Sequence, residues 1–190
     1  MKLSIMITAI SNRIELFSDL HKTLIKQVTP EVEILTACDY ESTDTDRVSR
    51  GGGAKRNNLL KAATGDYVVW IDDDDLVPDY FVAEILKAIE SKPDCVGYWN
   101  ECHLTEGGKT TIRLAKHSNS VDEWGEEDKI YLRSITFLNP VRRDIAIKFP
   151  FDGTYTADYE QSKLMKPYLH KEVFIDKVMY IYYPVGSRQL

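Results

Sequence analysis

One stretch near the middle of the chain constrains its fold more than any other. Five apolar residues at positions 67–71 are followed at once by four aspartates at positions 72–75. Five apolar residues in a row are typical of a strand buried on both faces, as in a parallel sheet. Four carboxylates at the end of one strand repel each other unless a cation binds there or water screens them. The stretch therefore predicts a central parallel strand with an acidic end.

The four aspartates have two interpretations. Aspartate favours helix N-termini, so the run suits a solvated acidic turn that also caps the next helix. Carboxylate oxygens are also the ligands that hard divalent cations prefer, alongside water and substrate phosphates. The second interpretation predicts a divalent-cation site that holds a phosphate-bearing ligand.

The segments before the aspartates alternate between strand and helix. Residues 3–10 and 32–37 are apolar enough for buried strands, and apolar side chains recur at helical spacing over residues 14–27. A strand–helix–strand unit of this length pairs its strands in parallel. Ligands bind open α/β sheets at the carboxyl ends of the strands, and Asp39 follows the second strand at that edge. Asp39 is thus either a ligand-binding residue or a turn residue.

A glycine run leads into a basic segment. Gly51-Gly52-Gly53 directly precedes Ala54-Lys55-Arg56-Asn57, at the start of a segment that is helical in pattern as far as Ala63. Glycines allow a ligand to approach the backbone closely, and a basic helix start can receive an anion or a nucleotide. A linker is the alternative, and the spacing excludes a P-loop.

The second half of the chain continues the alternation. A polar segment over residues 116–128, which contains Trp124, is typical of a loop over a site or of a solvated surface. Around it we expect a helix opened by proline, a hairpin with a glycine turn, an apolar segment, a second helix and a final strand. These expected elements lie at residues 78–89, 95–115, 135–141, 156–166 and 173–183.

Composition excludes several classes of protein. A net charge of −6 argues against a general nucleic-acid binder. Three cysteines without metal-site spacing predict free thiols in a reducing compartment. The apolar run at the N-terminus is too short for a signal peptide, and no later run is long enough to span a membrane. A cytoplasmic protein with one domain is therefore expected.

The order of these motifs resembles that of the family 2 glycosyltransferases, which have the nucleotide-diphospho-sugar transferase (GT-A) fold. The most specific part is similar to the family's Gly-x-x-Arg-Asn, Ala-x-Gly-Glu-Tyr and Asp-x-Asp-Asp signals. It consists of Gly53-Ala54-Lys55-Arg56-Asn57, Ala63-Thr64-Gly65-Asp66-Tyr67 and Asp72-Asp73-Asp74-Asp75. A weaker match covers Arg142-Arg143, Phe151-Asp152 and Ala157-Asp158.

The resemblance implies a fold and a domain layout. The expected fold is an α/β three-layer sandwich of the GT-A, Rossmann-like type, with a mixed, mostly parallel central sheet. A single domain would cover residues 1–190, with a nucleotide-binding half at 1–90 and an acceptor and catalytic-base half at 91–190. Two departures stand out: the loop between Asp39 and Gly51 leaves little room for the strand usual there, and Tyr180, Tyr182 and Tyr183 stand where some members supply a histidine to the metal.

The resemblance also implies an activity, which is metal-dependent transfer of a sugar, with inversion, from a nucleotide-diphosphate sugar to an acceptor hydroxyl. A UDP-sugar is the favoured donor. The metal is Mn²⁺ or Mg²⁺, bound by Asp74, while Asp72 contacts the ribose, Asp73 is the spacer between them and Asp75 is structural. The nucleotide-sugar-binding residues implied are Ala9, Arg13, Asp39, Gly53, Arg56, Asp72 and Asp73.

The catalytic base and the acceptor are less closely defined. Asp158 matches the family's base position best, Glu160 competes with it, and both also suit a helix N-terminus. A glycan, a lipid-linked sugar, a protein or a modified nucleobase would each serve as acceptor. The main alternative function is a non-catalytic nucleotide-sugar-binding module; a magnesium-dependent phosphatase or nucleotidylyltransferase fits less well.

Overall fold

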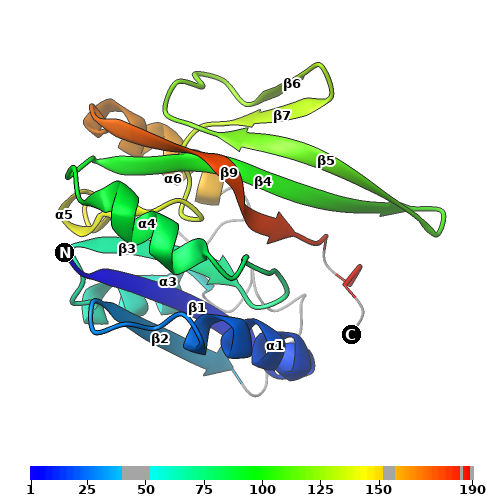
Figure 1. Ribbon diagram of the computed structural model, residues 1–190, viewed down its shortest axis with the longest axis horizontal. Coiled ribbons are helices and arrows are strands. Elements are labelled where there is room, and N and C mark those ends of the chain that lie inside the picture. Colours follow the sequence, from blue (N-terminus) through cyan, green and yellow to red (C-terminus); the bar gives the residue numbers. More distant parts are fainter. Residues whose placement is uncertain (40–51, 152–156, 185, 189–190) are drawn as a thin grey trace.

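The computed structural model describes residues 1–39, 52–151, 157–184 and 186–188. Within these ranges, nine strands form one mixed sheet with helices on both faces (Figure 1). The strand order is β2-β1-β3-β8-β4-β5-β7-β6, and β9 pairs with β4. This is an α/β sandwich, as the resemblance to family 2 glycosyltransferases implied.

The central strands are parallel, as predicted. They are β1 (Leu3–Ile10), β2 (Val32–Asp39) and β3 (Tyr67–Asp72). β1 lies between the other two, with Ile10 opposite Asp39 and Thr8 opposite Asp72. Because the three strands run in one direction, their carboxyl ends meet at the same edge of the sheet. The acidic turn therefore starts beside the end of β1.

The other strands form the mixed half of the sheet, which lies above the parallel strands in Figure 1. A long hairpin of β4 and β5 turns at Gly107 and Gly108, whose φ angles of 56° and 79° favour glycine. β9 runs parallel to β4, and short strands complete the half. The bounds are β4 (Cys95–Glu106), β5 (Lys109–His117), β6 (Gly125–Glu127), β7 (Ile130–Arg133), β8 (Val141–Arg142) and β9 (Glu172–Tyr182).

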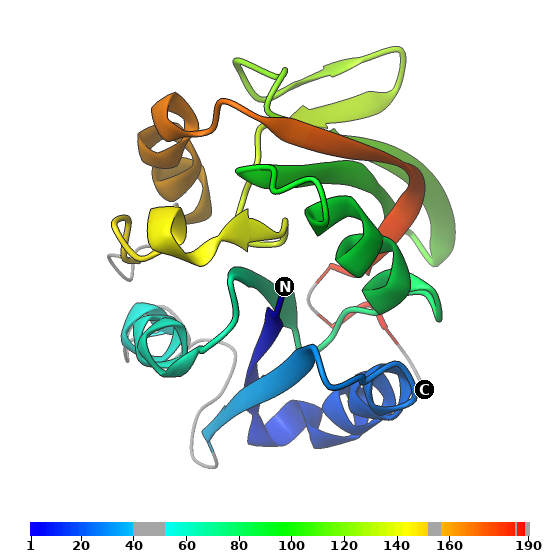
Figure 2. The ribbon, with the colours of Figure 1, turned by 60° about the vertical axis from the view of Figure 1, so that its left-hand side comes forward.

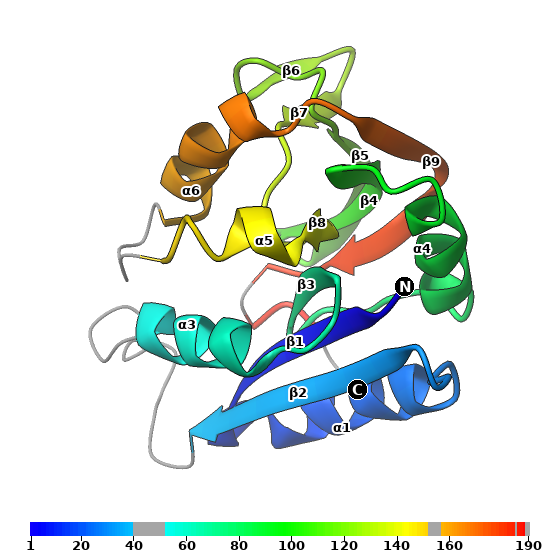
Figure 3. The ribbon, with the colours of Figure 1, turned by 90° about the vertical axis from the view of Figure 1, so that its left-hand side faces the viewer.

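The helices divide between the two faces of the sheet. α1 and α4 cover one face, and α3, α5 and α6 cover the other (Figure 2, Figure 3). The bounds are α1 (Ile14–Ile25), α3 (Gly52–Ala62), α4 (Phe81–Ile89), α5 (Arg143–Ala146) and α6 (Ala157–Met165), with single 3₁₀ turns at Ser11–Arg13 and Lys166–Tyr168. Among the described residues, no helix is long and apolar enough to cross a membrane.

Two hydrophobic cores explain the unbroken apolar run of β3. Tyr67, Val69 and Ile71 point into the core under α1 and α4. Val68 and Trp70 point into the opposite core, under α3 and α5. Successive side chains of a strand face opposite sides of the sheet, so both faces must be apolar when helices cover both.

One expectation about local structure differs from the fold, and one apolar segment now has an explanation. The helix after the aspartates begins at Phe81, and Pro78 lies in the turn before it, where its carbonyl accepts a hydrogen bond from the Phe81 N–H (3.1 Å). The apolar segment at residues 135–141 enters the sheet as a strand only at its end, in β8. Its side chains Ile135 and Phe137 fill the core beneath α3 and α5, which accounts for their apolar character.

The turn before β3 packs directly on β1, which yields a prediction about Gly65. The Gly65 N–H donates to Ser4 Oγ (2.9 Å), and a Cβ added at Gly65 would lie 2.5 Å from that oxygen and 2.7 Å from the Ser4 nitrogen. We expect Gly65→Ala to lower the free energy of unfolding by about 1–3 kcal/mol, because the chain must shift to admit a methyl group. Urea unfolding followed by circular dichroism measures this change.

Gly125 provides the matched control. A Cβ added there meets no atom within 4 Å, so Gly125→Ala should change stability by less than about 0.5 kcal/mol. Equal stabilities of the two variants would contradict the close packing of this turn on β1.

Candidate active site

The acidic turn, Asp72–Asp75, lies at the carboxyl end of β3, and its four carboxylates have four different environments. Asp73 is fully buried and accepts hydrogen bonds from the Ile10 N–H (2.9 Å) and from Arg13 Nη1 (3.1 Å). Arg13, itself 5% exposed, also pairs with Asp74 at 2.6 Å. One buried guanidinium therefore bridges two adjacent carboxylates and joins the end of β1 to the acidic turn.

Asp75 is held by the last strand of the sheet. Its two oxygens accept hydrogen bonds from the Tyr180 hydroxyl and from the Tyr183 N–H, each at 2.7 Å. The Tyr180 hydroxyl in turn accepts a hydrogen bond from the Asp72 N–H (3.1 Å). Burial raises the pKa of Asp75 well above its usual value, and the charges of Asp72 and Asp74 raise this pKa further. Asp75 thus has the partners of a structural residue.

Arg56 approaches the acidic turn from α3. Its Nη2 lies 3.0 Å from Asp72 Oδ1, and its guanidinium stacks over the rings of Phe137 (4.4 Å) and Phe151 (5.3 Å). The next residue, Asn57, exchanges two hydrogen bonds of 2.9 Å with the backbone of Phe151. These contacts fix both the middle of α3 and the direction of the arginine side chain.

Asp158 stands in the first turn of α6, on the other side of the acidic turn. Burial raises the pKa of its carboxyl, the charge of Asp72 adds to the rise, and the charge of Arg56 opposes it. Asp158 is therefore close enough to both residues to feel their charges. Glu160, in the same helical turn, is exposed. A partly buried carboxylate with a raised pKa is suited to accept a proton.

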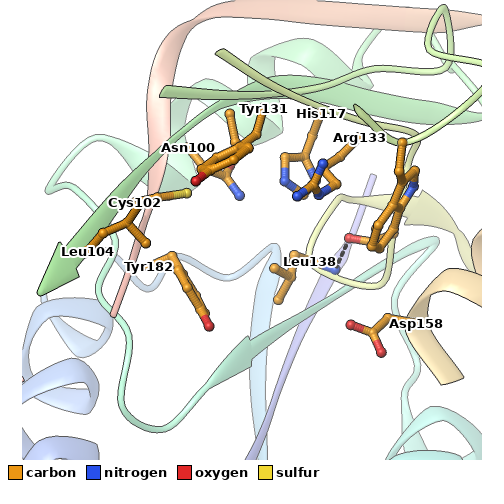
Figure 4. A pocket seen from close by; sticks show the side chains of 12 residues that line it. Asn100, Cys102, Leu104, His117, Tyr131, Arg133, Leu138, Asp158 and Tyr182 are labelled. Carbon is orange, nitrogen blue, oxygen red and sulfur yellow. Dashed lines mark hydrogen bonds between the residues drawn. The ribbon is translucent and has the colours of Figure 1, made fainter. Parts of the chain in front are cut away.

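Asp158 also borders a cavity of about 400 Å³, here called the hairpin cavity (Figure 4). Its wall is formed by alternate residues of the β4–β5 hairpin, by β7 and by the end of β9. Trp124, in the polar segment before β6, closes one side: its indole N–H donates to Ser134 Oγ (2.8 Å), which contacts Ser162 Oγ of α6 at 2.6 Å. The lining residues are Asn100, Cys102, Leu104, Ala115, His117, Trp124, Tyr131, Arg133, Thr136, Leu138, Asp158 and Tyr182.

The structure brings most of the sequence-derived site residues to one edge of the sheet. Arg13, Arg56, Asp72, Asp73 and Asp74 are in contact there, and Asp158 faces them. Ala9 and Gly53 are buried close to this edge, in β1 and at the start of α3. Asp39 is the last residue of β2, and its side chain and the segment 40–51 lie outside the described residues.

The wall of the hairpin cavity was not identified from the sequence. Asn100, His117 and Arg133 lie on three different strands, and nothing in their spacing marks them as one group. The predicted hairpin could have identified part of this wall, because alternate residues of paired strands share one face of the sheet. Applied to β4 and β5, that rule places Asn100, Cys102 and Ala115 together.

The carboxylate oxygens of the acidic turn suit a hard cation that takes its other ligands from a bound substrate. Asp72 and Asp74 offer carboxylate oxygens, whereas Asp75 is engaged by Tyr180 and Tyr183. In the described part of the chain, no group of three histidine, cysteine or acidic residues is placed to hold a metal. Magnesium commonly binds through one or two carboxylates and completes its shell with water and phosphate oxygens. The residues present therefore fit a metal–diphosphate complex better than a cage made by the protein alone.

Comparisons with known proteins agree with this architecture. The family model described as glycosyl transferase family 2 matches residues 45–149. Fragment 1–349 of S. aureus TarS is 17% identical, with a TM-score of 0.72 over 96% of this chain and 60% of that fragment. Its complex with UDP-GlcNAc gives a TM-score of 0.67 at 17% identity, over 99% of this chain and 60% of that fragment. Its complex with UDP gives 0.71 at 16% identity, over 97% and 61%.

These structural likenesses show the fold. The chain spans about three-fifths of the TarS fragment and 37% of a longer TarS chain. No curated protein matches the sequence.

Tyr180 gives a direct test of how the acidic turn is held. Tyr180→Phe removes the donor to Asp75 and the acceptor for the Asp72 N–H while it keeps the ring in the core. Leaving buried polar groups without partners costs about 1–3 kcal/mol, so we expect a loss of stability in that range by urea unfolding.

Tyr168→Phe is the matched control, because Tyr168 is 50% exposed. It should change stability by less than about 0.5 kcal/mol. A Tyr180→Phe variant as stable as this control would contradict the bracing role of Tyr180.

Proposed function

The chain belongs to glycosyl transferase family 2, and from this premise we propose that it transfers a sugar from a nucleotide-diphosphate sugar, with a UDP-sugar favoured, to an acceptor hydroxyl. The observation that carries the proposal is the convergence of Asp72, Asp74, Arg56 and Asp158 beside the carboxyl ends of β1 and β3. Ligands bind α/β sheets at this edge. The structurally similar TarS fragment binds UDP and UDP-GlcNAc, which favours a uridine nucleotide here.

The binding roles follow from position. Asp39, at the end of β2, contacts the nucleotide base, and Ala9 and Arg13 border the same pocket at the end of β1. Asp72 contacts the ribose. Asp73 stabilises the acidic turn through its hydrogen bonds with Ile10 and Arg13. Gly53 and Arg56 stand at the start of α3, and the stacked guanidinium of Arg56 is directed toward the diphosphate.

Asp74 would hold Mn²⁺ or Mg²⁺, with Asp72 as the second nearby carboxylate. The metal supplies positive charge that neutralises the departing diphosphate. Arg13 now pairs with Asp74 at 2.6 Å, so metal binding requires this guanidinium to share or release that carboxylate. Arg13 would keep its ion pair with Asp73 if it released Asp74.

Asp158 is the proposed base. It removes the proton of the acceptor hydroxyl as the acceptor oxygen bonds to the anomeric carbon of the donor sugar. The bond between that carbon and the diphosphate oxygen breaks, and the nucleoside diphosphate leaves with its electron pair. The acceptor attacks from the face opposite the diphosphate, so the anomeric configuration inverts. The raised pKa of Asp158 makes it a stronger base than an ordinary aspartate.

Asp74→Asn tests the metal site. Thermal unfolding of the wild type with UDP or UDP-GlcNAc should shift upward more in the presence of Mn²⁺ than in its absence, because binding to the folded state stabilises it. In Asp74→Asn the manganese-dependent part of the shift should disappear.

Asp79→Asn is the control, since Asp79 is exposed and lies just beyond the acidic turn. It should retain the full manganese-dependent shift. A shift in the wild type that is the same with and without the metal would rule out the metal site.

Asp158→Asn tests the base. In the variant, the rate at which the sugar of UDP-GlcNAc is transferred to an acceptor or to water, measured as UDP release, should fall by about 10²–10⁴-fold. The affinity for UDP should stay unchanged. In the wild type, kcat/KM should fall as the pH drops through the pKa of Asp158, which lies above the ordinary aspartate value of about 3.9. That acid limb should be absent from the residual activity of the variant.

Glu160→Gln separates the two candidate bases. Glu160 is exposed, so its variant should keep the wild-type rate and the wild-type acid limb. Loss of turnover in Glu160→Gln with full turnover in Asp158→Asn would assign the base to Glu160. Nucleotide-sugar binding without turnover in the wild type, tested over a panel of acceptors, would favour a binding module.

A further inference from the structure

The hairpin cavity contains polar groups that the proposed transfer step does not use. Asp158 stands at one side of it (Figure 4). The groups on the remaining wall are Asn100 on β4, His117 on β5 and Arg133 on β7. Because Asp158 and these groups line the same cavity, a molecule whose hydroxyl reaches Asp158 also contacts them.

The hydrogen bonds around His117 fix its tautomer. Asn139 donates from Nδ2 to the Val96 carbonyl (3.2 Å), and its Oδ1 accepts from the Thr136 N–H (3.1 Å). That same Oδ1 lies 3.2 Å from His117 Nδ1, so Nδ1 carries the proton and donates. Burial lowers the pKa of His117 to about 4, so the ring is neutral at neutral pH. Its Nε2 is consequently an acceptor on the cavity wall.

Asn100 adds a second polar group to this wall. It is 2% exposed, and its Oδ1 is buried without a hydrogen-bond partner among the described residues. Figure 4 shows the side chain on the same wall as His117, with its nitrogen directed toward the cavity. The amide therefore presents N–H donors to a ligand.

Of the described residues that line the hairpin cavity, Arg133 is the only one with a cationic side chain. Its guanidinium lies between the rings of Trp124 (5.0 Å) and Tyr131 (5.2 Å), and Nη1 donates to the Gly125 and Leu132 carbonyls at 3.1 and 2.8 Å. Within the described ranges, no carboxylate lies at ion-pair distance from it. The charge is therefore held in one orientation, with Nε and Nη2 left to donate to an anion.

The charge of Arg133 is not neutralised across the cavity either. Arg56 is the cation whose charge lowers the pKa of Asp158, whereas Arg133 acts on His117, whose pKa it lowers. Figure 4 shows Asp158 on the lower side of the cavity and Arg133 on its upper wall, near His117. Because the diphosphate is already provided for by Arg56 and the acidic turn, Arg133 is free for a different anion.

We propose that the hairpin cavity is the acceptor subsite and that it selects an anionic acceptor, whose phosphate or carboxylate binds Arg133. His117 Nε2 accepts a hydrogen bond from a hydroxyl of the same molecule, Asn100 Nδ2 donates to one of its oxygens, and another of its hydroxyls meets Asp158. This inference rests on the proposed function, because it takes Asp158 as the base. It adds the chemical class of the acceptor, which is a polyhydroxylated anion.

Binding of small probes tests the inference without requiring turnover. Calorimetry with UDP-saturated protein would compare glycerol 1-phosphate with glycerol, and glucuronate with glucose. We expect each anion to bind about tenfold or more tightly than its neutral counterpart, because a buried charge-assisted pair is stronger than a neutral hydrogen bond. The phosphate and carboxylate probes identify which anion the cavity prefers.

Arg133→Gln should abolish this preference while UDP affinity and hydrolysis of UDP-GlcNAc by water stay at wild-type levels. Arg133→Lys should keep part of the preference, since it keeps the charge. Arg113→Gln is the matched control: Arg113 lies on the same hairpin and pairs with Glu126, outside the cavity lining. It should bind the probes as the wild type does.

Cys102 reports whether the probes occupy the hairpin cavity. It is 9% exposed and lines the cavity, whereas Cys38 is exposed and Cys95 is buried. In a Cys38→Ser background, the anionic probe should slow modification of Cys102 by methyl methanethiosulfonate. Unchanged modification at saturating probe would place the probe elsewhere and overturn the assignment.

Other outcomes also decide against the inference. Equal affinities for anionic and neutral probes would remove the anion preference, and equal losses in Arg133→Gln and Arg113→Gln would remove Arg133 as its cause. Loss of UDP binding and of folding stability in both Arg133 variants would make the residue structural. Failure of the proposed function has a separate signature, which is the absence of UDP or UDP-GlcNAc binding whatever the probes do.

Discussion

Four adjacent carboxylates at the end of β3 repel one another, and the surrounding elements are arranged so that each one meets a donor. Arg13, just beyond β1, bridges Asp73 and Asp74, and Arg56 reaches Asp72 from α3. Tyr180 of β9 donates to the fourth, Asp75. Buried carboxylates without such partners would be costly, so the fold of this edge depends on these contacts. The acidic turn is consequently the point where the first strand, α3 and the last strand meet.

The two halves of the sheet contribute different chemistry. The parallel strands β1–β3 gather charged groups at one edge, which suits a nucleotide diphosphate and its metal. The mixed half contributes the hairpin cavity, with neutral polar groups and one fixed cation among the described residues that line it. α6 connects them, because Asp158 feels the charges of Arg56 and Asp72 and also borders the cavity. The Ser134–Ser162 contact ties the Trp124 side of the cavity to this helix.

Local patterns predicted much of this architecture. The strand–helix–strand unit, the hairpin turn at Gly107 and Gly108 and the final strand all lie where the sequence placed them, and the resemblance to family 2 glycosyltransferases is confirmed by the family match over residues 45–149. The pattern left the apolar segment at residues 135–141 without an element type. Ile135 and Phe137 are apolar because they fill a core beneath helices, and periodicity alone cannot distinguish that from a strand.

The sequence by itself determined the fold class, the family and the acidic turn, because these depend on residues that are near neighbours along the chain. Only the tertiary structure decided which partner holds each of these carboxylates. Arg13 lies 60 residues from Asp73, and Tyr180 lies 105 residues from Asp75. The same holds for the hairpin cavity, whose wall combines His117, Arg133 and Asp158 from separate elements. Pairings of this kind are set by strand register and helix packing, which bring distant side chains together without leaving a local pattern.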